Sequence, residues 1–287
     1  MPVPTFPTAA EAQHEVGQLF SRDGTRLHWE RYLPQKPRAA VAVLPGGGDH
    51  LGRYPALTRG LVEAGLEVAL LDFRGHGRSA GRRWHVDAFS RYHEDLDAFL
   101  VAVRERIGGR KLFVAAHSMG GLIAATWALA PGHAADGFVL SSPWFRPAVE
   151  PPRLKVAVGM LVGRVVPWLP IATGLRLEDL TSDEEMQAWT DEDALYGRKT
   201  TPRWFSEASE AQVGLFPRMR EFRHPLLVLA GSADRIADPS AGEAFADQAG
   251  SADKEFKLYD GLRHELWNER DRARTVGDAV RWISARI

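Results

Sequence analysis

The stretch K-L-F-V-A-A-H-S-M-G-G-L-I-A-A, residues 111–125, has the pattern of a strand that turns sharply into a helix. An apolar run ends at Ala116, and small residues follow Ser118. In such a turn, the positions two before and two after the serine lie close together. Both must therefore carry little or no side chain, as Ala116 and Gly120 do. The turn also lifts the Ser118 hydroxyl clear of the sheet and directs the N-terminus of the helix at a reacting carbonyl. We therefore predict that Ser118 is a nucleophile.

A serine hydroxyl is a weak nucleophile, so it needs a base, which in turn needs an acid to orient it. With this turn, the expected chain order is serine, acid, histidine. Asp234 comes just past the end of a predicted strand, and His264 lies in the loop after the next strand. Asp238 and Asp260 are alternative acids, and we favour Asp234 because it is the first acid after the strand. His117, beside the nucleophile, is more typical of a structural histidine than of the base.

A glycine-rich loop is the candidate oxyanion hole. The segment P-G-G-G-D-H, residues 45–50, follows a predicted strand, and glycines let backbone N–H groups face a ligand without an intervening Cβ. An oxyanion hole needs two such donors, one of which belongs to the residue after the nucleophile. We predict Met119 as that donor and Gly47 as the donor from the early loop.

Short apolar runs alternate with amphipathic stretches, which indicates an α/β fold with a mostly parallel sheet flanked by helices. The predicted strands are Arg26–Leu33, Ala40–Leu44, Glu67–Asp72, Leu112–Ala116, Gly137–Ser141, Leu226–Ala230 and Glu255–Tyr259. The predicted helices are Tyr54–Ala64, Asp87–Arg106, Gly120–Leu129, Ser240–Ala249 and Arg270–Ile287.

One region interrupts this alternation. No strand-like run is predicted between Trp144 and Phe222, where tryptophans, prolines and acidic clusters accumulate. We therefore expect residues 1–143 and 223–287 to form the core. Residues 144–222 are expected to form a helical cap, inserted between two strands and belonging to the same structural unit.

Composition limits the classes of function. The net charge is −1 and the chain contains no cysteine, which argues against nucleic acid as a partner and excludes thiolate nucleophiles and metal–thiolate sites. No H-E-x-x-H pattern occurs, so neither a metal nor another cofactor is expected. The N-terminal segment lacks a basic start and an apolar core, and the longest apolar stretch, 156–170, falls short of the ~20 residues of a membrane span. We expect a cytoplasmic protein, and oligomeric state is not predicted.

Taken together, these motifs resemble those of the monoacylglycerol lipase and lysophospholipase group of α/β-hydrolases. The resemblance rests on P-G-G-G-D-H-L-G-R-Y (45–54), L-D-F-R-G-H-G-R-S-A-G (71–81), A-H-S-M-G-G (116–121), L-S-S-P (140–143) and L-A-G-S-A-D-R-I-A-D (229–238). It implies the α/β-hydrolase fold, hydrolysis of lipid monoesters without a cofactor, and a cap over an acyl-chain tunnel.

Carried over residue by residue, the resemblance implies the triad Ser118, Asp234 and His264, with Gly47 and Met119 as oxyanion donors. The sequence departs from the family pattern at three positions. Pro45 replaces the histidine usual in the early loop, Asp49 stands where glutamate is frequent, and Ala116 replaces the first glycine of the elbow. The cap resembles the family too loosely to transfer substrate specificity.

Several functions share such a triad. A lysophospholipase, a small-ester carboxylesterase, a peptidase, a thioesterase and a perhydrolase all remain alternatives to a monoacylglycerol lipase. A ligand-binding protein on the same scaffold is a further alternative, although it would ordinarily lack a triad member. Residues 156–171 are apolar on nearly every side. We expect part of them to line an acyl site or to make transient contact with a membrane surface; a cap helix packed wholly on the core is the alternative.

Overall fold

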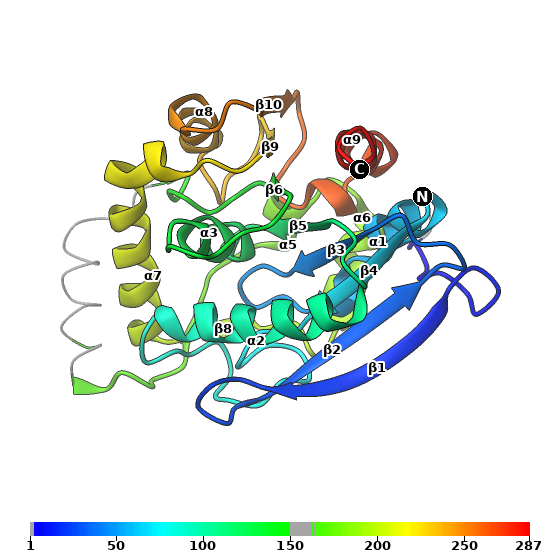
Figure 1. Ribbon diagram of the computed structural model, residues 1–287. Helices are drawn as coiled ribbons and strands as arrows, with labels where there is room; N and C mark the ends of the chain where they lie inside the picture. Colours follow the sequence, from blue (N-terminus) through cyan, green and yellow to red (C-terminus); the bar gives the residue numbers. More distant parts are fainter. Residues whose placement is uncertain (1–2, 150–161, 163–164) are drawn as a thin grey trace.

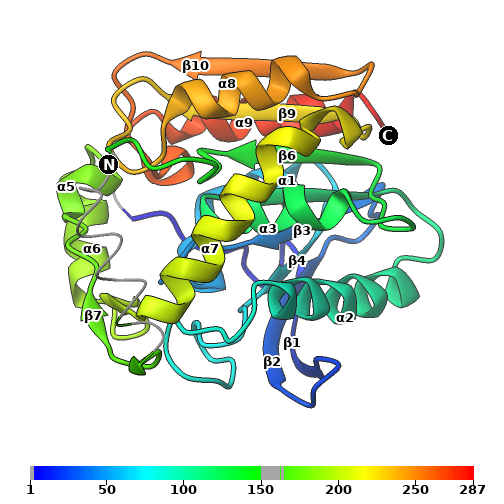
Figure 2. The ribbon, with the colours of Figure 1, turned by 90° about the vertical axis from the view of Figure 1, so that its left-hand side faces the viewer.

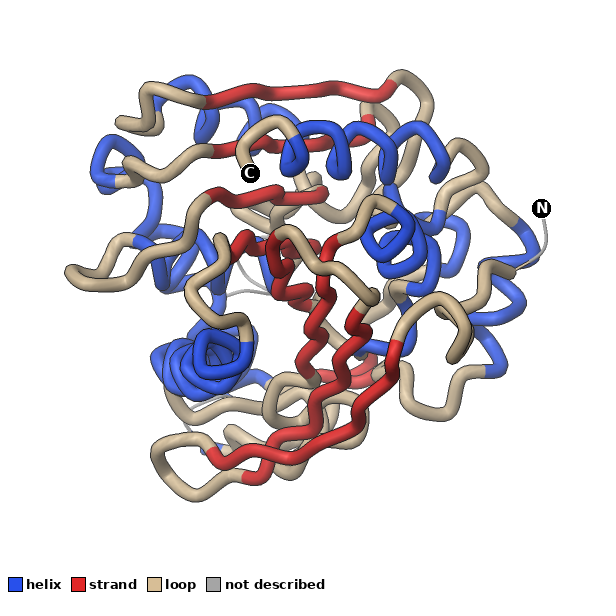
Figure 3. The backbone as a smooth tube through the Cα atoms, turned by 45° about the vertical axis from the view of Figure 1, so that its right-hand side comes forward, coloured by secondary structure: helices blue, strands red, loops and turns tan. Residues whose placement is uncertain are grey.

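The computed structural model describes residues 3–149, 162 and 165–287. Its centre is an eight-stranded sheet in the order β1-β2-β4-β3-β5-β6-β9-β10, and Figure 1 shows helices on both sides of it. The strands are β1 (Gln13–Phe20), β2 (Arg26–Leu33), β3 (Ala39–Leu44), β4 (Leu66–Leu71), β5 (Leu112–His117), β6 (Gly137–Ser141), β9 (Leu226–Gly231) and β10 (Lys254–Tyr259). Strands β3, β4, β5, β6, β9 and β10 pair in parallel, whereas β2 is antiparallel to both β1 and β4. Figure 3 shows the twist of this sheet.

Helices cover both faces of the sheet. The α-helices are α1 (Pro55–Glu63), α2 (Ser90–Arg106), α3 (Met119–Ala128), α5 (Leu177–Leu180), α6 (Glu184–Glu192), α7 (Pro202–Leu215), α8 (Pro239–Gln248) and α9 (Arg272–Ser284), and the 3-10 helices are η1 (Leu51–Arg53), η2 (Phe216–Glu221) and η3 (Leu266–Asn268). One apolar core lies between the sheet and α2, α3 and α8, and a second lies between the sheet and α1 and α9 (Figures 1 and 2).

This two-sided cover explains the uniform apolar strands. In β3, Ala40 and Ala42 face the first core, whereas Val41 and Val43 face the second, and all four are fully buried. A strand buried on both faces needs apolar residues at every position, so it lacks the alternation of a half-exposed strand. The seven predicted strands and five predicted helices of the core are confirmed, with strand ends displaced by at most one residue.

Strands in two regions of the chain were missed by the prediction. Strand β1 was not predicted because its sequence, Q-H-E-V-G-Q-L-F, has neither a continuous apolar run nor a strict alternation. It lies at the sheet edge, where β2 pairs with it. The region after Trp144 was expected to contain no strand, yet β7 (Ile171–Ala172) pairs with β8 (Lys199–Thr200). Each of these strands has two residues, which is too short to produce a periodic pattern.

Between β6 and β9 the chain forms α5, α6, the β7–β8 pair and α7. Figure 2 shows α5, α6 and β7 beyond the ends to which the sheet strands point. The apolar prediction for Val156, Val158, Met160 and Leu161 lies outside the described residues. Within the described ranges, no helix combines the length and the apolar character that a membrane span requires.

Candidate active site

Ser118 occupies a strained turn between β5 and α3. Its φ and ψ are 52° and −116°, a left-handed conformation that is rare for residues other than glycine. A Cβ at Gly120 would lie 2.5 Å from the carbonyl oxygen of Pro45 and 2.6 Å from that of Leu44. Only glycine therefore lets α3 begin directly against the end of β3, which brings the glycine-rich loop beside the serine.

A chain of hydrogen bonds leads from Ser118 to a buried carboxylate. His264 Nε2 lies 2.9 Å from Ser118 Oγ, and His264 Nδ1 lies 2.7 Å from Asp234 Oδ2. The other carboxylate oxygen of Asp234 accepts the N–H groups of Ile236 and Ala237 at 2.8 and 2.9 Å. A carboxylate on Nδ1 favours the tautomer with its proton there, which leaves Nε2 free to accept the serine proton.

The structure places the two alternative acids elsewhere. Asp238 caps α8 by accepting the N–H of Ser240 at 2.9 Å, and it forms an ion pair with Arg146 at 2.6 Å. Asp260 accepts a hydrogen bond from Ser232 Oγ at 3.0 Å. Neither carboxylate is recorded as a partner of the imidazole that contacts Ser118.

His117 lies beneath the candidate base. Its ring centroid is 4.8 Å from that of His264, and its Nδ1 lies 3.1 Å from the Ser141 carbonyl oxygen. Burial, with a smaller effect from the charge of His264, lowers the pKa of His117 to about 3. His117 therefore stays neutral and adds no second positive charge beside His264.

The two predicted oxyanion donors line the same cavity as Ser118. Within the described residues, no acceptor is recorded for the amide of Gly47 or of Met119. The neighbouring amide of Gly46, by contrast, donates to Tyr54 Oη at 3.2 Å, and that hydroxyl donates to Asp49 Oδ2 at 2.5 Å. Free N–H groups at Gly47 and Met119 are what an oxyanion requires.

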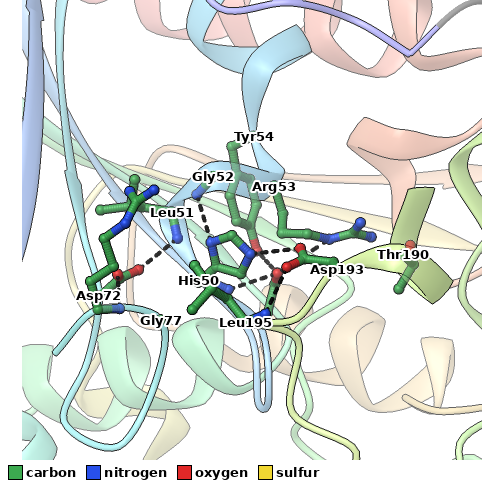
Figure 4. Close-up of polar contacts among 12 residues, drawn as sticks. His50, Leu51, Gly52, Arg53, Tyr54, Asp72, Gly77, Thr190, Asp193 and Leu195 are labelled. Carbon is green, nitrogen blue, oxygen red and sulfur yellow. Dashed lines mark hydrogen bonds and ion pairs between the residues drawn. The ribbon is translucent and has the colours of Figure 1, made fainter. Parts of the chain in front are cut away.

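The glycine-rich loop is also joined to the segment between β6 and β9. His50 Nε2 lies 2.7 Å from Asp193 Oδ2, and the N–H of Gly52 donates to His50 Nδ1 at 3.1 Å (Figure 4). The N–H of Gly197 donates to the Gly48 carbonyl at 2.6 Å. Sequence reasoning missed the contacts with Asp193 and Gly197 because their partners are more than 140 residues away and belong to no local motif.

A buried charge cluster lies behind the loop. Arg53 is fully buried, donates to Glu265 Oε2 at 3.0 Å and stacks on the Trp189 ring at 4.5 Å. Burial raises the pKa of Asp49, and the nearby Arg53 offsets this only in part. For Glu265, burial acts in the same direction, but the positive charge of Arg53 and other neighbours outweighs it and lowers the pKa. Glu265 is therefore the carboxylate that balances Arg53.

The cavity above Ser118 has a volume of about 600 Å³. Its polar lining includes Asp49, Tyr196 and Glu265. The larger part of its wall is apolar and includes Trp84, Trp144, Leu180, Trp204, Phe205 and Ile236. Across the described part of the chain, no three histidine or carboxylate side chains gather as a metal site would require.

Fold and site together define a serine hydrolase of the α/β-hydrolase fold. Residues 35–271 match the family model described as serine aminopeptidase, S33. The chain is 32% identical to the human monoglyceride lipase, covering 89% of this chain and 85% of the relative. It is 30% identical to the monoacylglycerol lipase of Mycolicibacterium smegmatis, covering 92% and 95%. The crystal structure of the Paleococcus ferrophilus monoacylglycerol lipase superimposes with a TM-score of 0.82 at 25% identity, over 91% of this chain and 99% of the other.

The chain belongs to the monoacylglycerol lipase group of the α/β-hydrolase superfamily and is a serine ester hydrolase. This confirms the family and the fold class predicted from the motifs.

Proposed function

We propose that the chain hydrolyses lipid monoesters, with monoacylglycerols as the preferred class, through an acyl-enzyme on Ser118. The proposal rests above all on the hydrogen-bonded chain Ser118–His264–Asp234, with distances of 2.9 and 2.7 Å, at the base of the cavity. Its similarity to the monoacylglycerol lipases supports the choice of substrate class.

The reaction proceeds in two acyl transfers. His264 Nε2 takes the proton of Ser118 as Oγ attacks the ester carbonyl carbon, and the N–H groups of Gly47 and Met119 stabilise the oxyanion. The carbon–oxygen bond to the alcohol then breaks, and the alcohol leaves with the proton from His264. Water, deprotonated by the same imidazole, attacks the acyl-enzyme and releases the fatty acid and free Ser118. Asp234 holds the imidazole and stabilises its protonated form throughout.

The lining of the cavity supports a glycerol ester of a single chain. The carboxylates of Asp49 and Glu265 and the hydroxyl of Tyr196 offer partners for alcohol hydroxyls. The aromatic and aliphatic wall offers an apolar surface for one acyl chain. Because the cavity offers an apolar surface for one acyl chain, the three chains of a triacylglycerol would not fit, and triacylglycerols should be poor substrates.

Exposed apolar side chains of the cap support transient contact with a membrane surface. Val165 is 69% exposed and Trp168 is 50% exposed. Others lie nearby in the chain, at Val149, Leu169, Ile171 and Leu175. Because Val149, Ile171 and Leu175 also line the cavity, a lipid that these residues contact would be delivered at its mouth. Binding to vesicles and its loss in Trp168→Ser would test this contact.

The first experiment tests the nucleophile. A fluorophosphonate probe should label the wild-type protein at Ser118, with loss of fluoride, and abolish its activity stoichiometrically, whereas Ser118→Ala should be unlabelled, inactive and folded. Folding is expected to survive because the change removes one oxygen from a turn outside the two apolar cores. Near-wild-type hydrolysis by Ser118→Ala would overturn the mechanism, and an unlabelled wild-type protein would favour a binding protein.

The second experiment tests the substrate class. Each buried methylene contributes ~0.8 kcal/mol, or about fourfold in kcat/KM, until the apolar wall is filled. Monoacylglycerols of medium to long chain should therefore have higher kcat/KM than acetyl or butyryl esters. A steady decline from the shortest ester onward would indicate a small-ester carboxylesterase, and a preference for lysophospholipids over matched monoacylglycerols would indicate a lysophospholipase.

A further inference from the structure

Trp84 has a strained backbone in the turn at residues 83–84. Its φ is +43°, although it is not a glycine, and its side chain is only 4% exposed. The main chain is held on both sides: its N–H donates to the Gly75 carbonyl at 3.0 Å, and its carbonyl accepts the hydroxyl of Thr200 at 3.3 Å. A left-handed tryptophan carries a cost of order 1–3 kcal/mol and persists only where surrounding structure enforces it.

The indole of Trp84 lies directly against the glycine-rich loop. A Cβ at Gly47 would be 2.7 Å from Trp84 Cζ2, and a Cβ at Gly48 would overlap Cζ3 of the same ring. Gly197 of the cap is also closely packed, since a Cβ there would be 3.4 Å from Trp84 Cε3. Three glycines, two in the loop and one in the cap, thus fit around one indole.

The loop is also held by hydrogen bonds from the cap. The N–H of Gly197 donates to the Gly48 carbonyl at 2.6 Å, and His50 pairs with Asp193 as Figure 4 shows. The indole itself is packed edge-to-face on Trp204 of α7, with centroids 5.2 Å apart and planes at 71°. Gly47 therefore packs against a buried aromatic ring, and the residues that follow it in the loop, Gly48 and His50, are anchored to the cap.

We propose that Trp84 is a positioning residue that fixes the direction of the Gly47 N–H in the oxyanion hole. The proposal rests on the proposed function, in which that N–H stabilises the oxyanion. A flexible glycine peptide can rotate, and rotation would turn the donor away from the developing charge. The indole fills the space into which the peptide would move, so the donor is oriented before substrate arrives.

Positioning a donor and lining a pocket have different kinetic consequences. The oxyanion exists only in the transition state and intermediates, so a misdirected N–H lowers kcat and leaves KM nearly unchanged. Complete loss of one donor costs on the order of 10²–10³ in kcat. Because Met119 is unaffected and Gly47 is displaced rather than removed, Trp84→Ala should lower kcat by about 10- to 100-fold. A pocket wall that merely contacts the acyl chain would instead raise KM.

The experiment compares Trp84→Ala with Trp144→Ala. Trp144 lines the same cavity and stacks on Trp204, with centroids 5.6 Å apart, and among the described contacts it has none with the glycines of the loop. We expect Trp84→Ala to lower kcat and to weaken an acyl trifluoromethyl ketone by the same factor, since its adduct with Ser118 places an oxyanion in the hole. Trp144→Ala should change mainly KM. Equal effects on kcat and on the ketone in both variants would overturn the proposal.

A double-mutant cycle separates this proposal from the proposed function. Gly47→Ala should lose activity because its Cβ meets Trp84, and Trp84→Ala should then cost less in that background than in the wild type. If Gly47→Ala leaves kcat and ketone affinity unchanged, Gly47 is not the donor and the oxyanion assignment fails. If Gly47→Ala is impaired but the Trp84 effect is additive or confined to KM, only the positioning role fails. Circular dichroism is the folding control. If Trp84→Ala does not fold, Trp84→Phe replaces it in the same measurements, because phenylalanine keeps one ring but cannot reach both glycines.

Discussion

The buried pair of Arg53 and Glu265 makes a quantitative prediction about stability. Arg53 is completely buried, and Glu265 Oε2 at 3.0 Å is its nearest carboxylate oxygen. Asp49 lies 3.6 Å away, but its raised pKa makes it a poor substitute for Glu265 as a counter-ion. Glu265→Gln keeps an acceptor for the amide of Asn268, which donates at 2.9 Å, and removes only the charge.

Breaking a buried pair by removing one partner costs about 3–5 kcal/mol, because the remaining charge stays buried without compensation. A chain of 287 residues has an unfolding entropy of about 0.6 kcal/mol per kelvin, so Tm should fall by about 5–8 °C. Urea unfolding and calorimetry measure both quantities. The exposed pair Arg218–Glu221 gives a matched control, since Glu221→Gln should leave Tm unchanged.

A second variant tests the cause of that loss. In Arg53→Met/Glu265→Gln the orphaned charge is gone, so most of the stability lost by Glu265→Gln should return. A fall in Tm of less than about 1 °C for the single variant, or no recovery in the double variant, would refute the view that charge balance holds this cluster.

Three further predictions concern rate, pH and metal. Asp234→Asn should lower kcat by several orders of magnitude by favouring the wrong tautomer of the imidazole, and a larger loss in Asp238→Asn would show that the acid is misassigned. Burial lowers the pKa of His76 and His93 to about 4 and that of His117 to about 3. An unfolded histidine binds a proton near pH ~6.5, so the unfolded state binds more protons below that pH. Burial of these neutral rings therefore does not lower the free energy of unfolding above pH ~6.5. Below that pH the free energy of unfolding falls toward pH 4, by ~1.4 kcal/mol per pH unit for each ring. Urea titrations at several pH values measure the slope, and His76→Gln should reduce it by one ring's share; an unchanged slope would contradict this account. EDTA should not alter turnover, and inhibition that added zinc reverses would contradict a metal-free mechanism.

The sequence alone determined the class of fold and the order of the candidate site. Buried parallel strands are apolar at every position, so their limits could be located to within a residue. Their carboxyl ends meet at one edge of the sheet, so Ser118, Asp234 and His264 could be expected to converge although they are far apart in the chain. Strand β1 escaped prediction for the converse reason: at an exposed edge, nothing requires its side chains to be apolar.

The tertiary structure decided everything that depends on contact between distant loops. The strain at Ser118 could be anticipated from its neighbours, but the strain at Trp84 could not, because one of the hydrogen bonds that hold its main chain comes from Thr200, more than 100 residues further along the chain. The pairing of Arg53 with Glu265 has no signature either, since each residue taken alone is an ordinary charged residue. Local sequence patterns indicate periodicity and turn type. These contacts depend instead on which surfaces meet after the sheet has formed, so they can be identified only in the folded chain.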